Sequence, residues 1–110
     1  NNPTQLEVGQ IVSDEPGIYR TNQWGIRIEN LITVIPAERK AAATTDDEFL
    51  TFETLTLCYY DTSLIEMSLM TPAEIEWLNA YHARVYKEIA PRLNDKDAAF
   101  LQEKCKPLSL

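Results

Sequence analysis

The sequence predicts an α+β fold in which antiparallel strands come first and two helices follow. Residues 10–60 contain β-branched and aromatic segments that alternate between apolar and polar positions, which is typical of strands. Beyond Asp61 the apolar positions recur at helical spacing instead. A chain of 110 residues fits one domain with a modest core.

Three strands are predicted in the first half of the chain. The first covers Gln10–Asp14 and ends at a Pro16-Gly17 turn. The clearest strand is "WGIRIENLITVI", and a turn over Asn22–Gly25 predicts a hairpin with the strand before it. One of its faces carries Ile26, Ile28, Ile32 and Val34, and the other carries Arg27, Glu29, Leu31 and Thr33. After a polar loop, "AERKAAATTDDE", the segment "FLTFETLTLCYY" predicts a third strand antiparallel to the second.

Two helices are predicted in the second half. Thr71 is placed as N-cap, Pro72 at the first helical position and Glu74 as the partner in a capping box. The apolar positions of this helix are Ile75, Leu78, His82, Val85 and Ile89. Pro91 ends it near Ala90, and a shorter helix begins near Asn94 and ends before Pro107. We find no internal repeats.

Charge and composition exclude several classes of function. The net charge is −7, which argues against binding to nucleic acid or to anionic membranes. No apolar run reaches the roughly 20 residues of a membrane span, and the first residues do not have the pattern of a signal peptide. Cys58 and Cys105 lie far apart and belong to no metal motif, so we expect two buried, reduced thiols and a reducing, cytoplasmic setting.

Common catalytic motifs are not found. The sequence has no nucleophile elbow, phosphate loop, dinucleotide fingerprint or zinc-helix motif. Its one histidine, His82, falls on the apolar face of the first helix, which predicts a partly buried side chain that is hydrogen-bonded to a neighbour. With one histidine, a self-contained hydrolytic triad is not expected.

Carboxylates therefore become the candidates for chemistry. Glu15 follows the first strand with the parity of Ser13, and Glu29 lies on the same face as Arg27. If the two segments are neighbours in the sheet, both glutamates can point into one cavity. Two carboxylates suit hard cations such as Mn²⁺, Mg²⁺ or Ca²⁺, although they do not fill a coordination sphere. The alternative is an exposed strand acid that pairs with Arg27.

Four segments carry a more specific signal. In this order, "VSDEPGIY", "GIRIENL", "FLTFETLTL" and "LMTPAEIEWLNAYHARV" resemble the C-terminal part of Xaa-Pro aminopeptidase, also called aminopeptidase P. The likeness covers about Pro3 to Pro107, and the "EPG" and "GIRIEN" motifs are typical of metallopeptidases with the pita-bread fold. The resemblance places residues 1–60 in the C-terminal part of the catalytic domain and residues 61–110 in its helical tail.

The resemblance implies a site with two metal ions, usually Mn²⁺. Glu15 matches a ligand of one ion, Glu29 matches the ligand that bridges both, and Arg27 matches the arginine beside them. The implied reaction removes an N-terminal residue that precedes proline, and the implied assembly is a homodimer. The family's two aspartate ligands and its histidine ligand lie upstream of these motifs. We therefore expect the 110-residue chain to be an inactive C-terminal fragment that binds Mn²⁺ weakly and associates with itself through surface that meets the missing N-terminal part.

Two other functions compete with this one. A pita-bread domain without its metal ligands could serve as a non-catalytic interaction or dimerisation module, but Glu15, Glu29 and Arg27 are all present. A prolidase-like dipeptidase is disfavoured by the segment from Phe49 onward. The chain starts with "NNPT" and lacks an initiator methionine, so we expect it to belong to a longer protein.

Overall fold

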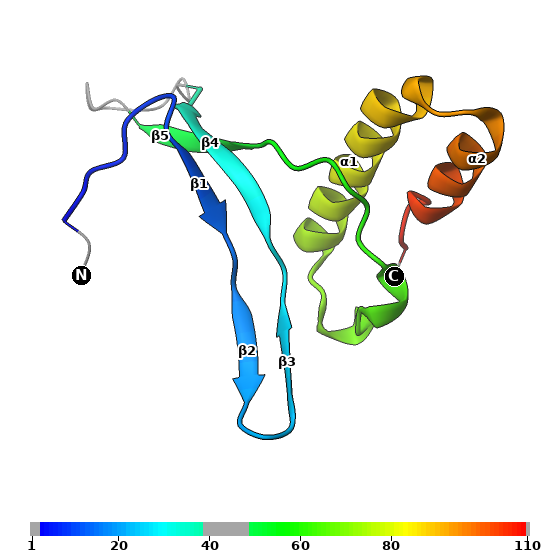
Figure 1. The fold of residues 1–110 in the computed structure, drawn as a ribbon, viewed down its shortest axis with the longest axis horizontal. Coiled ribbons are helices and arrows are strands. Elements are labelled where there is room, and N and C mark those ends of the chain that lie inside the picture. The colour runs from blue at the N-terminus through cyan, green and yellow to red at the C-terminus, as the bar shows by residue number, and fades with distance from the viewer. Residues whose placement is uncertain (1–2, 39–48, 110) are drawn as a thin grey trace. The chain divides into compact units, whose positions relative to one another are not determined.

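The computed structural model describes residues 3–38 and 49–109. The chain forms two compact units, residues 1–56 and 57–110. Strands make up the first unit and helices the second (Figure 1), which confirms the predicted order. The predicted polar loop falls almost entirely on residues 39–48, outside the described residues. The boundary expected at residue 60, between catalytic domain and tail, stays a prediction.

The strand unit contains two antiparallel sheets. One has the strand order β1-β4-β5 and the other pairs β2 with β3. The strands are β1 (Ile11–Asp14), β2 (Gly17–Arg20), β3 (Trp24–Arg27), β4 (Asn30–Pro36) and β5 (Leu50–Thr54). The third predicted strand is indeed antiparallel to the second, since β5 pairs with β4.

The two pairings share one register. Asp14 pairs with Asn30 at the end of one ladder, and Gly17 pairs with Arg27 at the start of the other. The hairpin is therefore continuous and only its ladder is interrupted, around Pro16, which has no N–H to donate. Its carbonyl still accepts a bond of 3.2 Å from the Ile28 N–H. The predicted strand end at Asp14 is confirmed, but the predicted turn at Pro16-Gly17 was wrong, because the chain continues straight into β2.

The hairpin turn lies slightly earlier than predicted. Arg20 pairs with Trp24, and the Gln23 N–H donates to the Arg20 carbonyl over 3.0 Å. Asn22 has a φ of 57°, a left-handed conformation that asparagine tolerates better than most residues. Gly25, predicted as part of the turn, belongs to β3.

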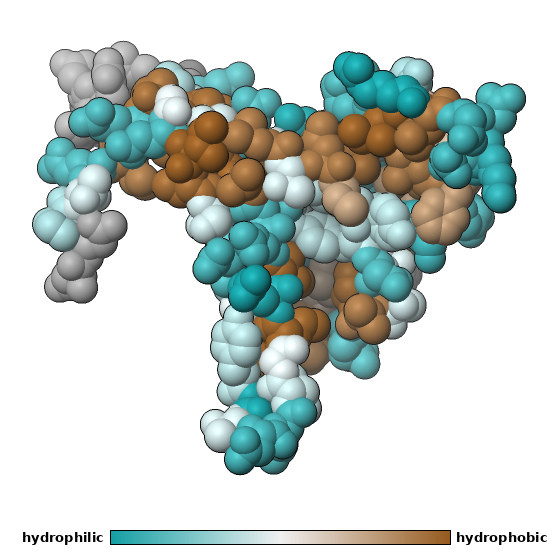
Figure 2. Space-filling model, in the orientation of Figure 1, coloured by the Kyte–Doolittle hydropathy of each residue, from teal (hydrophilic) through white to brown (hydrophobic). Residues whose placement is uncertain are grey.

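The strand unit buries little of its own apolar surface. Among its described residues only Val34 is fully buried, whereas Ile18, Ile26 and Ile28 are at least half exposed. These isoleucines lie on one face of the hairpin, and Figure 2 shows apolar residues at the surface of the strands as well as of the helices. Exposed apolar surface of this kind marks a contact with another chain segment or protein.

The helical unit has the predicted elements, namely α1 (Pro72–Ile89), a short turn η3 (Ala90–Arg92) and α2 (Asp95–Lys104). The capping box is confirmed, since the Glu74 N–H donates to Thr71 Oγ1 over 3.3 Å and the Thr71 N–H donates to Glu74 Oε2 over 2.8 Å. Asn94 caps α2 as predicted, by accepting a bond from the Asp97 N–H.

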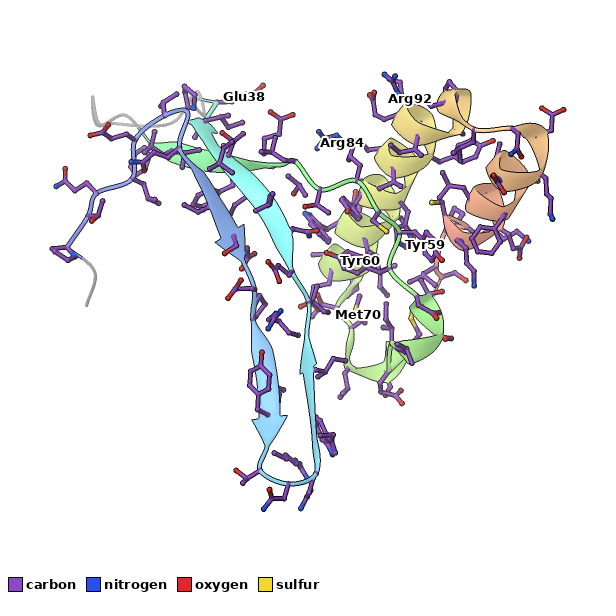
Figure 3. The ribbon with its side chains drawn as sticks, viewed as in Figure 1. Glu38, Tyr59, Tyr60, Met70, Arg84 and Arg92 are labelled. Carbon is purple, nitrogen blue, oxygen red and sulfur yellow. The ribbon has the colours of Figure 1, made fainter. Side chains whose placement is uncertain are left out.

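The core of this unit is formed by Leu78, Tyr81, Val85 and Leu101. The segment that precedes the helices is attached to α1, and Tyr59 and Tyr60 lie on it (Figure 3). Tyr81 Oη donates to the Cys58 carbonyl over 2.9 Å and accepts from its N–H. The third strand was predicted to continue to Tyr60 but ends at Thr54. The Leu55 and Thr56 N–H groups still donate to the Leu31 carbonyl of β4. The N–H groups of Cys58 and Tyr60, further on, donate to side chains of α1.

Two short 3-10 turns precede α1. They are η1 (Thr62–Leu64) and η2 (Met67–Leu69). Their sequences, "DTSLI" and "EMSLM" with the flanking residues, form a five-residue repeat. This similarity is far shorter than the repeats of a repeat architecture, which have periods of about 20–50 residues. Within the described ranges, no helix is long and apolar enough to cross a membrane.

Candidate metal centre

Glu15 and Glu29 lie at the interruption of the long hairpin. One step beyond the Asp14–Asn30 pair, the common register places Glu15 opposite Glu29. Opposite residues of a regular antiparallel pair have Cβ atoms about 4.5–5.5 Å apart and share one face. The two segments are thus neighbours, as the parity argument requires, and both carboxylates are exposed in this unit.

The hairpin has two chemically different faces. The register places Tyr19 and Arg27 on the same face as the two glutamates. The opposite face carries Ile18 against Ile26, with Ile28 next to them. The alternation that the sequence predicted for residues 26–29 therefore separates a polar, ionisable face from an apolar one.

Arg27 connects the groups of the polar face. Its Nε lies 3.3 Å from Glu29 Oε2, and both side chains are about half exposed, at 50% and 44%. A hydrogen bond to the Tyr19 hydroxyl is the largest cause that raises the pKa of Arg27. The negative charges of Glu29 and Glu15 act in the same direction. The guanidinium is therefore held as a cation between a phenol and two carboxylates.

Two glycines make room for the Tyr19 ring. A Cβ on Gly17 would lie 2.6 Å from Tyr19 Oη, and a Cβ on Gly25 would lie 2.6 Å from Tyr19 Cδ1. Real Cβ atoms essentially never approach so closely, so the ring can lie across the hairpin only because both positions lack a side chain. Gly17 is also the cross-strand partner of Arg27, which explains how the Tyr19 hydroxyl reaches the guanidinium.

The donor set fits part of a site for a hard divalent cation. Carboxylate oxygens are the ligands that Mn²⁺, Mg²⁺ and Ca²⁺ prefer. Like charges directly opposite in a sheet repel, so a cation between Glu15 and Glu29 would relieve a cost that Arg27 offsets only in part. Across residues 3–38 and 49–109, no three His, Cys, Asp or Glu side chains cluster as a metal site, so further ligands would have to come from elsewhere.

His82 has the structural role predicted for it. It is fully buried, and its Nε2 accepts a bond of 3.0 Å from the Tyr60 N–H. Its proton is therefore on Nδ1, which is buried and has no hydrogen-bond partner. Burial lowers the pKa of His82, since the charged imidazolium would lose its hydration.

The cysteines correct one expectation. Both are free thiols, as predicted, but Cys58 is exposed and only Cys105 is partly buried. Cys58 lies at the start of the segment that connects the strands to the helices, where the backbone and not the side chain is bound by Tyr81. Burial raises the pKa of the Cys105 thiol, and the nearby Cys58 adds to this.

Sequence reasoning missed three residues of the polar face, Tyr19, Gly17 and Gly25. A signal for the tyrosine was present, because Tyr19 has the same parity as Glu15 once the strand is allowed to continue past Pro16. The role of the two glycines requires the register of β2 against β3, which the sequence does not supply.

Comparison with known families defines the class of the chain. A profile for the C-terminal region of peptidase M24 matches residues 48–108, more than half of the chain. The chain therefore belongs to this family. Together with the preceding hairpin it corresponds to the C-terminal part of aminopeptidase P, as the resemblance implied.

Two similar proteins are aminopeptidases P. Xaa-Pro aminopeptidase app-1 from Caenorhabditis elegans is 40% identical over 108 residues, which are 94% of this chain and 17% of that protein. Aminopeptidase P2 from Arabidopsis thaliana is 44% identical over 95 residues, 84% of this chain and 13% of that protein.

A solved structure supports the same family assignment. X-prolyl aminopeptidase from C. elegans, described as a cytosolic enzyme with a di-nuclear active site, has a TM-score of 0.86 and 39% identity over 97% of this chain. The match covers 18% of that structure, so the chain spans less than a fifth of the length of these relatives. The chain is thus a portion of a pita-bread fold, which confirms the predicted fold class.

Proposed function

We propose that the chain is the C-terminal part of a metal-dependent Xaa-Pro aminopeptidase, which removes an N-terminal residue that precedes proline. The observation that carries this proposal is the register that sets Glu15 opposite Glu29, with Arg27 bonded to Glu29. The names of its relatives and their length, more than five times that of this chain, support it.

Glu15 and Glu29 would hold the metal ions, Glu29 as the ligand shared by both. Two divalent cations, expected to be Mn²⁺, would supply Lewis-acid activation and a nucleophile at neutral pH when bound. Arg27 donates to the Glu29 carboxylate, fixes its orientation and reduces the repulsion between the two acids. Tyr19 in turn fixes Arg27.

The site needs the upstream part of the protein. Two carboxylates leave most of a coordination sphere empty, and the described residues provide no third ligand nearby. We place the remaining ligands, two aspartates and a histidine, upstream of this chain. The 110-residue chain by itself would then neither hydrolyse Xaa-Pro peptides nor bind Mn²⁺ tightly.

Partners and location follow from the same proposal. The substrates would be peptides with proline in second position, and the chain would contact the upstream part of its own protein and a second copy in a homodimer. The exposed isoleucines of the hairpin support such contacts. A cytoplasmic location is supported by the two free thiols and by the cytosolic location of the C. elegans enzyme.

The test is peptide cleavage by the full-length protein and three variants. Glu15→Gln and Glu29→Gln keep the size of the side chain and remove its charge, and Glu88→Gln is the matched control on the exposed face of α1. We expect the first two to abolish cleavage of a peptide with proline in second position, and the control to cleave it like the wild type. A full-length protein that cleaves no such peptide would instead favour the non-catalytic interaction module.

A further inference from the structure

The segment between the strands and α1 contains two consecutive copies of one structural unit. Residues 61–65 and 66–70 each consist of an acidic residue, a variable residue, serine, an exposed leucine and a half-buried apolar residue. Each copy forms one 3-10 turn, and the two copies have the same burial pattern from first to last residue. Because the two copies agree in sequence, in turn type and in burial, Leu64 and Leu69 are exposed in the same way.

Side-chain caps hold both turns in place. Asp61 Oδ1 accepts bonds from the Ser63 N–H at 3.1 Å and from its hydroxyl at 2.7 Å. Glu66 Oε1 accepts the equivalent bonds from Ser68, at 3.2 Å and 2.6 Å. These bonds keep both carboxylates ionised, since they lower the pKa of Asp61 and of Glu66.

Each turn has one apolar residue that faces the core of the helical unit and one that faces outward. Ile65 and Met70 pack against the core of the helical unit, and Figure 3 shows Met70 on the segment before α1. Leu64 and Leu69 remain 76% and 81% exposed, more than any other large apolar residue in the described ranges. Because the inner residues and the caps already order the backbone, a partner that covers the leucines would have little ordering entropy left to overcome.

We propose that Leu64 and Leu69 form a docking site for the upstream part of the same polypeptide. This inference rests on the proposed function, in which most of the protein precedes this chain. The matched profile is a C-terminal region, and the relatives are more than five times as long, so the length available upstream is large.

Size favours this occupant over a second copy of the chain. A stable dimer needs about 800 Å² of buried surface on each partner, far more than two leucine side chains supply. A segment of the same polypeptide is held nearby covalently, so a small apolar contact is sufficient to keep it in place.

Hydroxyl-radical footprinting of the full-length protein tests the proposal. The oxidation of each leucine is measured in the native and in the denatured protein, and Leu78, which is 5% exposed, serves as the internal buried reference. We expect the native-to-denatured ratio of Leu64 and Leu69 to fall to that of Leu78. A ratio that stays well above that of Leu78 would overturn the proposal, and protection that disappears on dilution would assign the site to a second copy instead.

A pair of variants links the protection to stability. Replacing both Leu64 and Leu69 with Ser should lower the thermal midpoint of the full-length protein, whereas the matched control Leu93→Ser, outside the repeat, should leave it nearly unchanged. Equal midpoints for the double variant and the wild type would contradict docking. Peptide cleavage by the same samples separates the two proposals. An active enzyme whose Leu64 and Leu69 are oxidised refutes only the docking site. An inactive protein whose Leu64 and Leu69 are protected refutes only the proposed function.

Discussion

His82 makes the helical unit sensitive to mild acid. The imidazole is fully buried, its Nε2 accepts from the Tyr60 N–H, and its Nδ1 has no partner. The rings that face it belong to Tyr60 and Tyr81, neither of which can offset a positive charge near neutral pH. Protonation of Nε2 would break the bond to Tyr60 and place a cation in the core, which is why burial lowers the pKa of His82.

The sign of the pH effect follows from linkage. The pKa of His82 in the folded chain lies below the ordinary value of 6.5. Between these two values His82 is protonated in the unfolded chain and neutral in the folded chain. Stability is therefore lost as the pH falls below 6.5 toward the lowered folded pKa. The loss amounts to about 1.4 kcal/mol for each pH unit over which only the unfolded state is protonated.

The assay is chemical denaturation of the 110-residue chain, followed by far-ultraviolet circular dichroism at about pH 7.5 and about pH 5.5. At the lower value, about one unit below the unfolded pKa, we expect a loss of up to about 1.4 kcal/mol. Asp61, Glu66 and Glu74 have lowered pKa values and begin to contribute only below about 4.5, outside this window.

A His82→Phe variant is the control. It leaves the Tyr60 N–H without an acceptor and should lose about 1–3 kcal/mol at every pH, but its stability should not change between the two pH values. The reasoning is refuted if the wild type is equally stable at both values, or if the variant shows the same acid-dependent loss.

Three further predictions concern single residues. Gly17→Ala places a methyl group 2.6 Å from the Tyr19 hydroxyl. It should lower peptide turnover by the full-length enzyme on the order of 10²-fold. Normal turnover would show that the position of Tyr19 is unimportant. Thr71→Ala removes the N-cap of α1 and should cost about 1 kcal/mol in denaturation, whereas Thr71→Ser should cost little. Val85→Ala empties a fully buried position and should cost roughly 2 kcal/mol, and a loss near zero would mean that the core repacks.

The helices were the most predictable part of the fold, because their signals are local. A threonine, a proline and a glutamate within four residues determine the start of α1, and the structure forms the bonds that these residue types imply. Asn94 determines the start of α2 in the same way. Such bonds connect residues three apart in the sequence and depend on nothing else in the fold.

The strands were less predictable, because their ends depend on distant partners. A turn was expected at Pro16-Gly17 after the first strand, but the Pro16 carbonyl still accepts from Ile28 and the chain resumes as β2. β5 ends at Thr54 although the Leu55 and Thr56 N–H groups still donate to the Leu31 carbonyl of β4. No local pattern in either strand records these interactions.

The candidate site was predictable as a pair of acids but not as a network. Strand parity placed Glu15 and Glu29 on one face, and the register agrees with it. The contact of Arg27 with Tyr19 depends on a side-chain position that only the glycines allow. The capped repeat that presents Leu64 and Leu69 was also missed, since five residues are too few for the period of a fold-level repeat.

The most direct test of the central claim is the metal content of the full-length protein. Purified wild type, Glu15→Gln, Glu29→Gln and Glu88→Gln are dialysed against Mn²⁺, and the bound metal per chain is measured by mass spectrometry. Glu29→Gln should lose most of the bound metal, Glu15→Gln should lose part of it, and Glu88→Gln should retain the wild-type content. Full metal content in both Glu15→Gln and Glu29→Gln would contradict the assignment of this hairpin as half of a metal centre.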